Sequence, residues 1–141
     1  MPKRVHRICR SRWVALDGEG ARRAGGRWNS PGRAVVYMAS SIPLAVLENL
    51  VHMSRQDFPT GYVLVSAVIP EDFEILSLAD DANPPEGGDE WFDSQASAVL
   101  RVSSVVVPGE SNFLLNPAHP DFGRIVIEPA TPFEFDPRLF S

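Results

Sequence analysis

Three short runs rich in β-branched residues constrain the fold of this chain most. They read GYVLVSAVI at 61–69, LRVSSVVV at 100–107 and RIVIE at 124–128, and Pro70 and Pro108 end the first two runs. Valine and isoleucine favour strands because their branched side chains pack well on a pleated sheet. Proline ends such a run because it cannot donate a hydrogen bond to a neighbouring strand. Each run therefore predicts a β-strand.

Weaker patterns predict the other elements. We expect strands at 5–9 and 33–38, a helix at 42–53, a short strand or connector at 71–78, a polar loop at 80–89, a short helix at 91–98 and an ordered turn at 112–116. Strands dominate and only one or two helices are inserted, which predicts an α+β domain. The 141 residues suffice for one hydrophobic core, so we expect a single domain over residues 1–141.

The composition argues against several classes of protein. Hydrophobic residues make up 44% and charged residues 22%, as in ordinary globular proteins. No run approaches the roughly 20 apolar residues that cross a bilayer, and the first residues lack the apolar core of a signal peptide, so we expect a cytoplasmic protein. The net charge of -5 argues against a general nucleic-acid binder. Eight of the 13 Lys and Arg residues precede residue 28, which suits a local anion site.

The single cysteine, Cys9, carries no motif around it. One cysteine cannot form an internal disulfide, and the chain has no CxxC pair that would hold zinc. We therefore expect no metal site. Cys9 itself is expected to be a small buried residue.

Residues 18–29, GEGARRAGGRWN, form the most unusual segment. Four glycines and three arginines suit neither a helix nor a strand, because glycine costs backbone entropy in both, so a ligand-binding loop is expected. The guanidinium of Arg27 can grip a phosphate or carboxylate with two parallel hydrogen bonds, and Trp28 beside it offers a stacking surface. The alternative for Arg27 is an ordinary solvated charge, which is what we expect of Arg22 and Arg23.

The expected helix at 42–53 is nearly apolar, with Ser40 or Ser41 as its N-cap and Pro43 in the first turn. At 100° per residue, most of its side chains form a broad apolar arc. The remaining narrow strip holds Ala45, Glu48, Asn49 and His52. Because this strip has no lysine and one carboxylate, we expect it to line a pocket. The alternative is a short exposed edge.

Glu48 is the most specific catalytic candidate. A partly desolvated carboxylate either has a raised pKa or pairs with a cation, such as Arg27 or His52. Facing a sugar carbon, it can stabilise the positive charge that develops as a glycosidic bond breaks, or orient the nucleophile. His52 lies one turn later and can hydrogen-bond Glu48. Tyr37 can pack beneath a planar ligand, or it can be a core tyrosine.

Polar residues near the C-terminal half are less specific. Ser103 and Ser104 interrupt an apolar strand, where a hydroxyl either donates to a ligand or faces solvent. Asn112, Asn116 and His119 are expected to cap turns. The chain has no Walker loop, GxSxG elbow or HExxH pair, and the glycine-rich segment does not fit the dinucleotide fingerprint because it precedes a strand.

Four segments in this order resemble the RES-domain proteins, the toxin components of bacterial RES–Xre toxin–antitoxin systems. They are GEGARRAGGRWNSPG, VVYMASSIPLAVLENLVH, LRVSSVVVPGESNFLLNPAHPDF and PFEFDPRLF. The family takes its name from an Arg, a Glu and a Ser, which match Arg27, Glu48 and Ser104. The family usually has Val-Pro-Ser before the last of these, whereas this chain has Val102-Ser103-Ser104.

The resemblance implies a fold similar to the ADP-ribosyltransferases, with a small mixed sheet and a cleft that binds NAD. It also implies an enzyme that breaks the nicotinamide–ribose bond, by hydrolysis or phosphorolysis. The alternatives within the resemblance are a protein ADP-ribosyltransferase and a catalytically silent antitoxin-binding module. The implied partner is an Xre-type helix-turn-helix antitoxin in a hetero-oligomer, with operator DNA reached only through the antitoxin.

The resemblance also implies roles for individual residues. Arg27 would hold the pyrophosphate or the nicotinamide ribose, Tyr37 would shape the nicotinamide pocket, and Glu48 would stabilise the oxocarbenium-like ribose; these are the expected catalytic residues. Further NAD-binding residues are expected at Arg7, Trp28, His52, Ser104 and Asn112.

Overall fold

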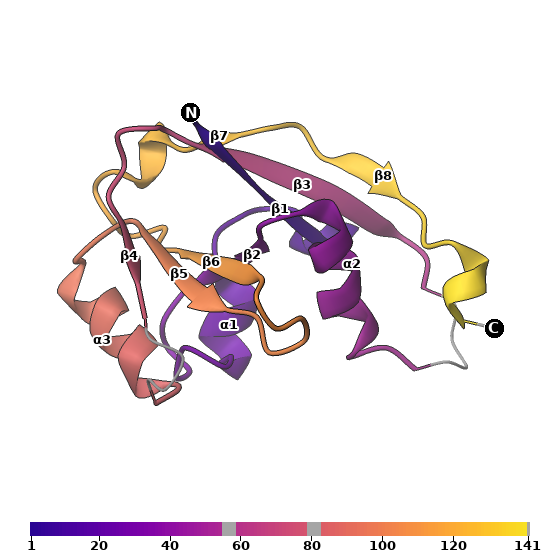
Figure 1. The fold of residues 1–141 in the computed structure, drawn as a ribbon, viewed down its shortest axis with the longest axis horizontal. Coiled ribbons are helices and arrows are strands. Elements are labelled where there is room, and N and C mark those ends of the chain that lie inside the picture. Colours follow the sequence, from indigo (N-terminus) through magenta and orange to yellow (C-terminus); the bar gives the residue numbers. More distant parts are fainter. Residues whose placement is uncertain (55–58, 79–82, 141) are drawn as a thin grey trace.

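The computed structural model describes residues 1–54, 59–78 and 83–140, which fold around one mixed β-sheet (Figure 1). The strands are β1 (Lys3–Arg10), β2 (Val36–Ala39), β3 (Tyr62–Ile69), β4 (Ile75–Ser77), β5 (Val99–Ser103), β6 (Ser111–Leu115), β7 (Val126–Ile127) and β8 (Thr131–Phe133). The α-helices are α1 (Glu19–Ala24), α2 (Ile42–Leu50) and α3 (Glu86–Ser94), and the 3₁₀ turns are η1 (Ser11–Trp13), η2 (Phe122–Arg124) and η3 (Pro137–Phe140). The predicted α+β class is confirmed.

The sheet has the strand order β4-β5-β6-β2-β1-β3-β7, and β8 also pairs with β3. Neighbouring strands are antiparallel, apart from the parallel pair β4 and β5. β1 and β3 pair along their whole length, whereas β1 and β2 meet in a single residue pair, His6 and Ala39. The sheet therefore consists of two halves, and few hydrogen-bonded residues join them where β1 meets β2.

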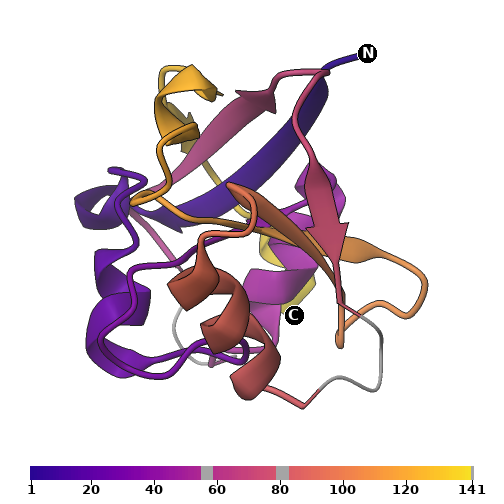
Figure 2. The ribbon, with the colours of Figure 1, turned by 90° about the vertical axis from the view of Figure 1, so that its left-hand side faces the viewer.

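Buried apolar side chains hold α2 and α3 to the sheet. α2 contributes Leu44 and Ala45 to a cluster that contains Phe135, and α3 contributes Trp91 to a cluster that contains Trp28. Full burial of such a large side chain stabilises the fold by about 1.5–3 kcal/mol. α1 and α3 lie at the same end of the molecule, so the chain between α1 and β2 passes beside α3 (Figures 1 and 2).

α2 begins where the sequence predicts and ends earlier. The Ser41 hydroxyl caps it by accepting a hydrogen bond from the Leu44 N–H at 3.2 Å, and Pro43 lies in the first turn. The helix ends at Leu50, and the next residues form a turn, so the prediction that it continues to Met53 is wrong.

As predicted, the narrow strip of α2 lines a cavity, and of its four residues only His52 is exposed. Ala45 is buried, and the Asn49 amide donates to the main-chain oxygen of Ile8 at 2.9 Å. The apolar arc is only partly buried: Leu47 is 42% exposed and Val51 is 56% exposed. These two side chains are exposed because the rest of the protein packs against the other side of the helix, which carries the narrow strip and meets β1.

The predicted loop at 18–29 is wrong over the residues of α1. Glu19 at the start of this helix forms ion pairs with Arg22 at 2.6 Å and Arg23 at 2.9 Å, one turn later. These hydrogen bonds lower the Glu19 pKa to about 2. Local pairs at this spacing support a helix, and the only glycine inside it is Gly20, since Gly18 and Gly25 are its caps.

The predicted turn at 112–116 is also wrong. These residues lie mostly in β6, which pairs with β2 on one side and β5 on the other. The asparagines and the following Pro117 are turn signals, but Phe113, Leu114 and Leu115 are almost completely buried. Apolar burial in the centre of the sheet outweighs the local turn signal.

The predicted helix at 91–98 is displaced toward the N-terminus, because α3 begins at Glu86 and ends at Ser94. The polar loop predicted at 80–89 is therefore wrong from Glu86 on, and its residues 80–82 lie outside the described residues. The glycine pair at the start of α3 indicated a loop. In the structure Gly88 is buried against another segment, a tertiary contact that the local sequence does not reveal.

Three of the predicted strands are shorter than expected, whereas the segment predicted as a short strand or connector contains the short strand β4 (Ile75–Ser77). β2 begins at Val36, and β7 has only two residues. β5 ends at Ser103, and the next residue marks the base of the loop to β6, where the Ser104 N–H donates to the main-chain oxygen of Glu110.

Candidate active site

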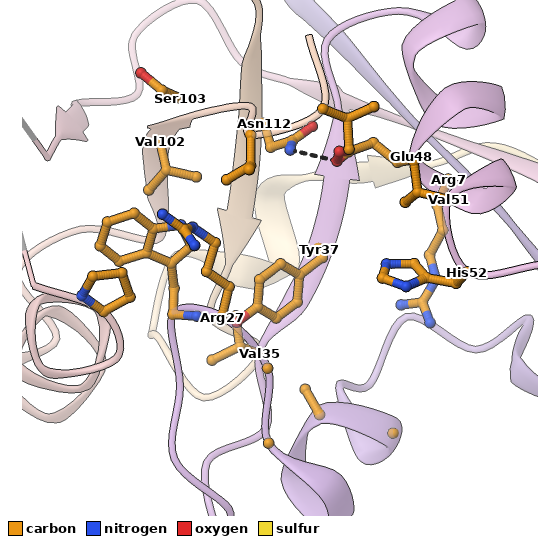
Figure 3. A pocket seen from close by; sticks show the side chains of 18 residues that line it. Arg7, Arg27, Val35, Tyr37, Glu48, Val51, His52, Val102, Ser103 and Asn112 are labelled. Carbon is orange, nitrogen blue, oxygen red and sulfur yellow. Dashed lines mark hydrogen bonds between the residues drawn. The ribbon is translucent and has the colours of Figure 1, made fainter. Parts of the chain in front are cut away.

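The main cavity lies between α2, the segment that joins α1 to β2, and strands β5 and β6 (Figure 3). Its volume is about 1150 Å³. The predicted site residues that line it are Arg7, Arg27, Trp28, Tyr37, Glu48, His52 and Asn112. Ser104 lines an adjoining cavity of about 270 Å³ instead. The fold thus brings most of the predicted residues to one place.

Tyr37 occupies the middle of this cavity on β2 (Figure 3). Its hydroxyl accepts a hydrogen bond from the Trp28 N–H at 2.9 Å and donates one to Asn29 Oδ1 at 2.7 Å. Burial raises the Tyr37 pKa to about 12, and the charge of Asp89 acts in the same direction. The phenol is therefore neutral at physiological pH.

The backbone near Tyr37 requires a glycine at position 26. A Cβ atom on Gly26 would lie 2.7 Å from the Tyr37 hydroxyl oxygen. Asn29 supports the same turn: its side-chain nitrogen lies within hydrogen-bond distance of the main-chain oxygens of Ala21 at 3.0 Å and Arg33 at 3.2 Å. Asn29 was not predicted as a site residue, because nothing in the sequence distinguishes it from an ordinary turn asparagine.

Arg27 and Arg7 lie on opposite sides of Tyr37 (Figure 3). The Arg27 side chain is exposed, and its guanidinium lies 5.6 Å from the centre of the Trp28 ring. Trp28 itself is only 5% exposed and packs in the core with Trp91. The ring therefore forms part of the cavity wall, but most of its surface is covered by the core and little is left for a ligand to stack on.

Glu48 projects from α2 into the cavity, and two side chains, one from β6 and one from the turn after β5, hold its carboxylate. Oε2 accepts a hydrogen bond from the Asn112 amide at 2.9 Å, and Oε1 accepts a longer one from the Ser104 hydroxyl at 3.4 Å. Within the described parts of the chain, no ion pair joins Glu48 to Arg27 or His52. Of the two alternatives for Glu48, pairing with Arg27 or His52 is therefore not found, and the neutral donors Asn112 and Ser104 bind the carboxylate instead.

Ser104 and Asn112, which both donate to Glu48, differ in their other hydrogen bonds. Ser104 is buried, and its hydroxyl oxygen also accepts from the Val107 N–H at 3.0 Å. Asn112 lines the main cavity, and its Oδ1 atom is buried with no hydrogen-bond partner among the described residues. The expectation that Asn112 caps a turn is wrong, because it lies on β6 and its amide binds the carboxylate.

A smaller cavity of about 310 Å³ continues behind Glu48 toward β1. It shares Arg7 and His52 with the main cavity and reaches His6. His6 was not singled out in the sequence; it is buried, and its Nδ1 atom lies 2.7 Å from the Ser66 hydroxyl. Burial lowers the His6 pKa, and Arg4 adds to the shift.

Across the described residues, no group of three or more His, Cys, Asp or Glu side chains is arranged to hold a metal ion. No helix in the same residues is long and apolar enough to span a bilayer. Cys9 is a free, buried cysteine whose pKa is raised by burial.

Several proteins named as toxins are similar in sequence. The Prs ADP-ribosylating toxin of Sphingobium sp. (strain YBL2) is 41% identical over 140 residues, which cover 88% of this chain and 86% of the relative. Toxin Res of Photorhabdus laumondii is 41% identical over 135 residues, covering 86% of each chain. Toxin Res of Yersinia enterocolitica is 38% identical and covers 96% of this chain and 98% of its own.

A solved structure confirms the fold. A chain in the crystal structure of the M. tuberculosis MbcT–MbcA toxin–antitoxin complex superposes with a TM-score of 0.71 at 18% identity, covering 99% of this chain and 87% of that chain. The RES domain pattern matches residues 4–136. This chain therefore belongs to the RES-domain family.

Proposed function

We propose that this chain is a toxin enzyme that consumes NAD by breaking the bond between nicotinamide and its ribose. The observation that carries the proposal is the Glu48 carboxylate, held in a large cavity by Asn112 and Ser104. The cavity of about 1150 Å³ exceeds the roughly 300–1,000 Å³ of common small-molecule sites, which suits a dinucleotide.

Glu48 supplies the negative charge that this chemistry needs. When the glycosidic bond breaks, its electron pair goes to the nicotinamide nitrogen, which leaves neutral, and the ribose carbon becomes oxocarbenium-like. A carboxylate fixed near this carbon stabilises its positive charge without having to reorganise. The acceptor oxygen then bonds to the carbon: a water acceptor releases a proton to solvent, whereas a phosphate acceptor attacks through an unprotonated oxygen.

The two arginines and Tyr37 suit the rest of NAD. Arg27 and Arg7 lie on opposite sides of Tyr37, so the dinucleotide can lie across the ring with its phosphates near a guanidinium. The phenol stays neutral because its pKa is about 12. It presents an aromatic surface to the nicotinamide without adding a negative charge beside Glu48. Trp28, His52 and Asn112 complete the lining.

The names of the relatives support the toxin role and the partner. Toxin Res and an ADP-ribosylating toxin are more than a third identical to this chain, and a toxin–antitoxin complex shares the fold. In this proposal, an Xre-type helix-turn-helix antitoxin keeps the enzyme inactive in the cytoplasm in a hetero-oligomer, and operator DNA is bound through the antitoxin. The proposal also includes that residues 1–141 form a single domain and that this domain carries out the reaction.

A second candidate is transfer of ADP-ribose to a protein, which the name of the Sphingobium relative favours. Its bond-breaking step is the same, and only the acceptor differs. Labelled NAD would then mark a cell protein in a lysate, whereas hydrolysis or phosphorolysis would leave the label in small molecules.

The test is to incubate the purified chain with NAD, with and without phosphate, and to follow nicotinamide release. Mass spectrometry of the other product separates ADP-ribose from its phosphorylated form. Nicotinamide release that is lost in Glu48→Gln supports the proposal. No release at micromolar enzyme, together with normal growth when the chain is expressed without an antitoxin, would instead indicate a silent binding module.

A further inference from the structure

We infer that α3 clamps the segment that carries Arg27, with Asp89 as a positioning residue for NAD cleavage. The inference rests on the proposed function. Among the described residues that line the main cavity, none belongs to α3. The helix nevertheless contacts the chain directly after the cavity's arginine: Gly88 contacts Trp28, and Asp89 binds Ser30.

Gly88 brings the backbone of α3 directly against Trp28. A Cβ atom on Gly88 would lie 1.8 Å from the Trp28 main-chain oxygen and 2.7 Å from its carbonyl carbon. No side chain fits into this space. The backbone of α3 and the Trp28 carbonyl group are therefore in direct contact, with no side chain between them.

Asp89 binds the next part of the same segment. Its Oδ1 atom accepts from the Ser30 N–H at 2.8 Å, and its Oδ2 atom accepts from the Ser30 hydroxyl at 2.6 Å. The Asp89 side chain is 16% exposed, so these bonds are largely shielded from water. Hydrogen bonds to an ionised acceptor are the stronger kind.

These contacts fix the chain immediately after Arg27. The Trp28 N–H is bound to the Tyr37 hydroxyl at 2.9 Å, the Trp28 carbonyl rests on Gly88, and the Ser30 N–H is bound to Asp89. The backbone from which Arg27 projects is thus held from the cavity side by β2 and from the outer side by α3.

α3 is itself anchored to the core. The Trp91 indole N–H donates to the Ser97 hydroxyl at 3.0 Å, and this hydroxyl donates to the main-chain oxygen of Val99 at 2.7 Å. Asp93, one turn after Asp89, pairs with Arg33 at 2.7 Å on the surface. Arg33 also lies 3.6 Å from Asp89 Oδ1, so both carboxylates share this arginine. Asp93 therefore provides a matched control: it is an acidic residue on the same helix with the same arginine partner, and it does not bind Ser30.

The experiment compares Asp89→Ala, Asp89→Asn and Asp93→Ala for nicotinamide release, well below the melting temperature of each variant. Misplacement of a binding group by about 1 Å costs up to about 100-fold, so we expect Asp89→Ala to lower kcat/KM about 10–100-fold. Asp89→Asn should recover part of this loss, because its amide oxygen still accepts from the Ser30 N–H. Asp93→Ala should stay within about twofold, as for other surface ion pairs. Equal losses in Asp89→Ala and Asp93→Ala would overturn the inference.

A second readout does not depend on activity. The chain has two tyrosines, so ¹⁹F NMR of fluorotyrosine-labelled protein in a Tyr62→Phe background follows Tyr37 alone. The Tyr37 hydroxyl accepts from the Trp28 N–H, so its resonance reports the position of the segment that Asp89 holds. Asp89→Ala should shift or broaden this resonance, and Asp93→Ala should leave it unchanged. If the wild-type chain releases no nicotinamide, the proposed function fails, and the clamp is then judged by this resonance. An unchanged Tyr37 resonance in Asp89→Ala would overturn the clamp.

Discussion

The two sides of the cavity are held in different ways. On the carboxylate side, which we define as Glu48, Ser104 and Asn112, hydrogen bonds end on the functional group itself. On the arginine side, which comprises Arg27, Trp28, Asn29 and Tyr37, they end on the backbone and on the tyrosine hydroxyl. The guanidinium of Arg27 is left exposed above the Trp28 ring.

This difference matches the two tasks of an NAD-cleaving site. A charge that stabilises a transition state acts best when it is already in place, because reorganisation during the reaction costs free energy. A guanidinium that binds a flexible pyrophosphate can move with its ligand. We therefore expect changes on the carboxylate side to affect kcat, and changes at Arg27 to affect KM.

The largest effect is expected for Glu48→Gln. The amide has the same size and its oxygen can still accept from Asn112, but the negative charge is lost. Loss of a preorganised electrostatic group costs about 10²–10³-fold in kcat, so nicotinamide release should fall by that factor with the melting temperature nearly unchanged. Glu74→Gln, at an exposed position, is the control. A kcat equal to wild type would show that Glu48 is not the charge that acts.

The next largest effect is expected for Arg27→Ala. A hydrogen bond to a charged group contributes about 1.5–3 kcal/mol, so KM for NAD should rise roughly 10–100-fold while kcat changes little. Arg12→Ala is a close control, because the Arg12 guanidinium lies 5.7 Å from the adjacent Trp13 ring but does not line the cavity. A fall in kcat with unchanged KM would reverse our assignment of the two sides.

Asn112→Asp should give an intermediate effect with a pH signature. It replaces the donor that lies 2.9 Å from Glu48 with a second carboxylate. Two carboxylates this close do not both ionise readily, so the pKa of one rises. The acidic limb of the pH–rate profile should move to higher pH by about one unit, and the rate should recover at alkaline pH. An unshifted limb would mean that Asn112 does not touch the working carboxylate.

The smallest effect is expected for Glu19→Gln, which tests the support of the arginine side. Hydrogen bonds from Arg22 and Arg23 lower the Glu19 pKa from 4.5 to about 2. A lowered folded-state pKa gives a stabilisation that is present above pH 4.5 and is lost as the pH falls through about 2. Glu19→Gln should therefore lower the melting temperature slightly at pH 7 and not at pH 2, since the pairs are exposed and screened. If the variant and the wild-type chain have the same melting temperature at pH 7 as well as at pH 2, these pairs do not support α1.

The strands of the sheet were largely predictable from sequence, because β-branched runs at 61–69 and 100–107 carry their own signal. β6 was not, since its local turn signals outweighed three apolar residues in the pattern. The start of α3 was missed for a related reason: Gly88 indicates a loop locally, but it is buried against Trp28.

The candidate site shows the same division. The sequence singled out Glu48 as a lone carboxylate on an apolar helix and Arg27 as an arginine after two glycines. It did not reveal that neutral donors from β6 and the turn after β5 hold Glu48, because these lie 64 and 56 residues further along the chain. Asn29 and Asp89 were missed because their importance lies only in which atoms they contact.

The sequence by itself determined the α+β class, most strands of the sheet and the residues that carry charge in the cavity, because these depend on local pattern and on residue chemistry. The tertiary structure alone decided which groups meet. It placed Asn112 and Ser104 on the Glu48 carboxylate, set Arg7 and Arg27 on either side of Tyr37, and packed α3 against Trp28. Such contacts join residues distant in sequence, so they follow from the pairing of strands and the packing of helices, which no local pattern encodes.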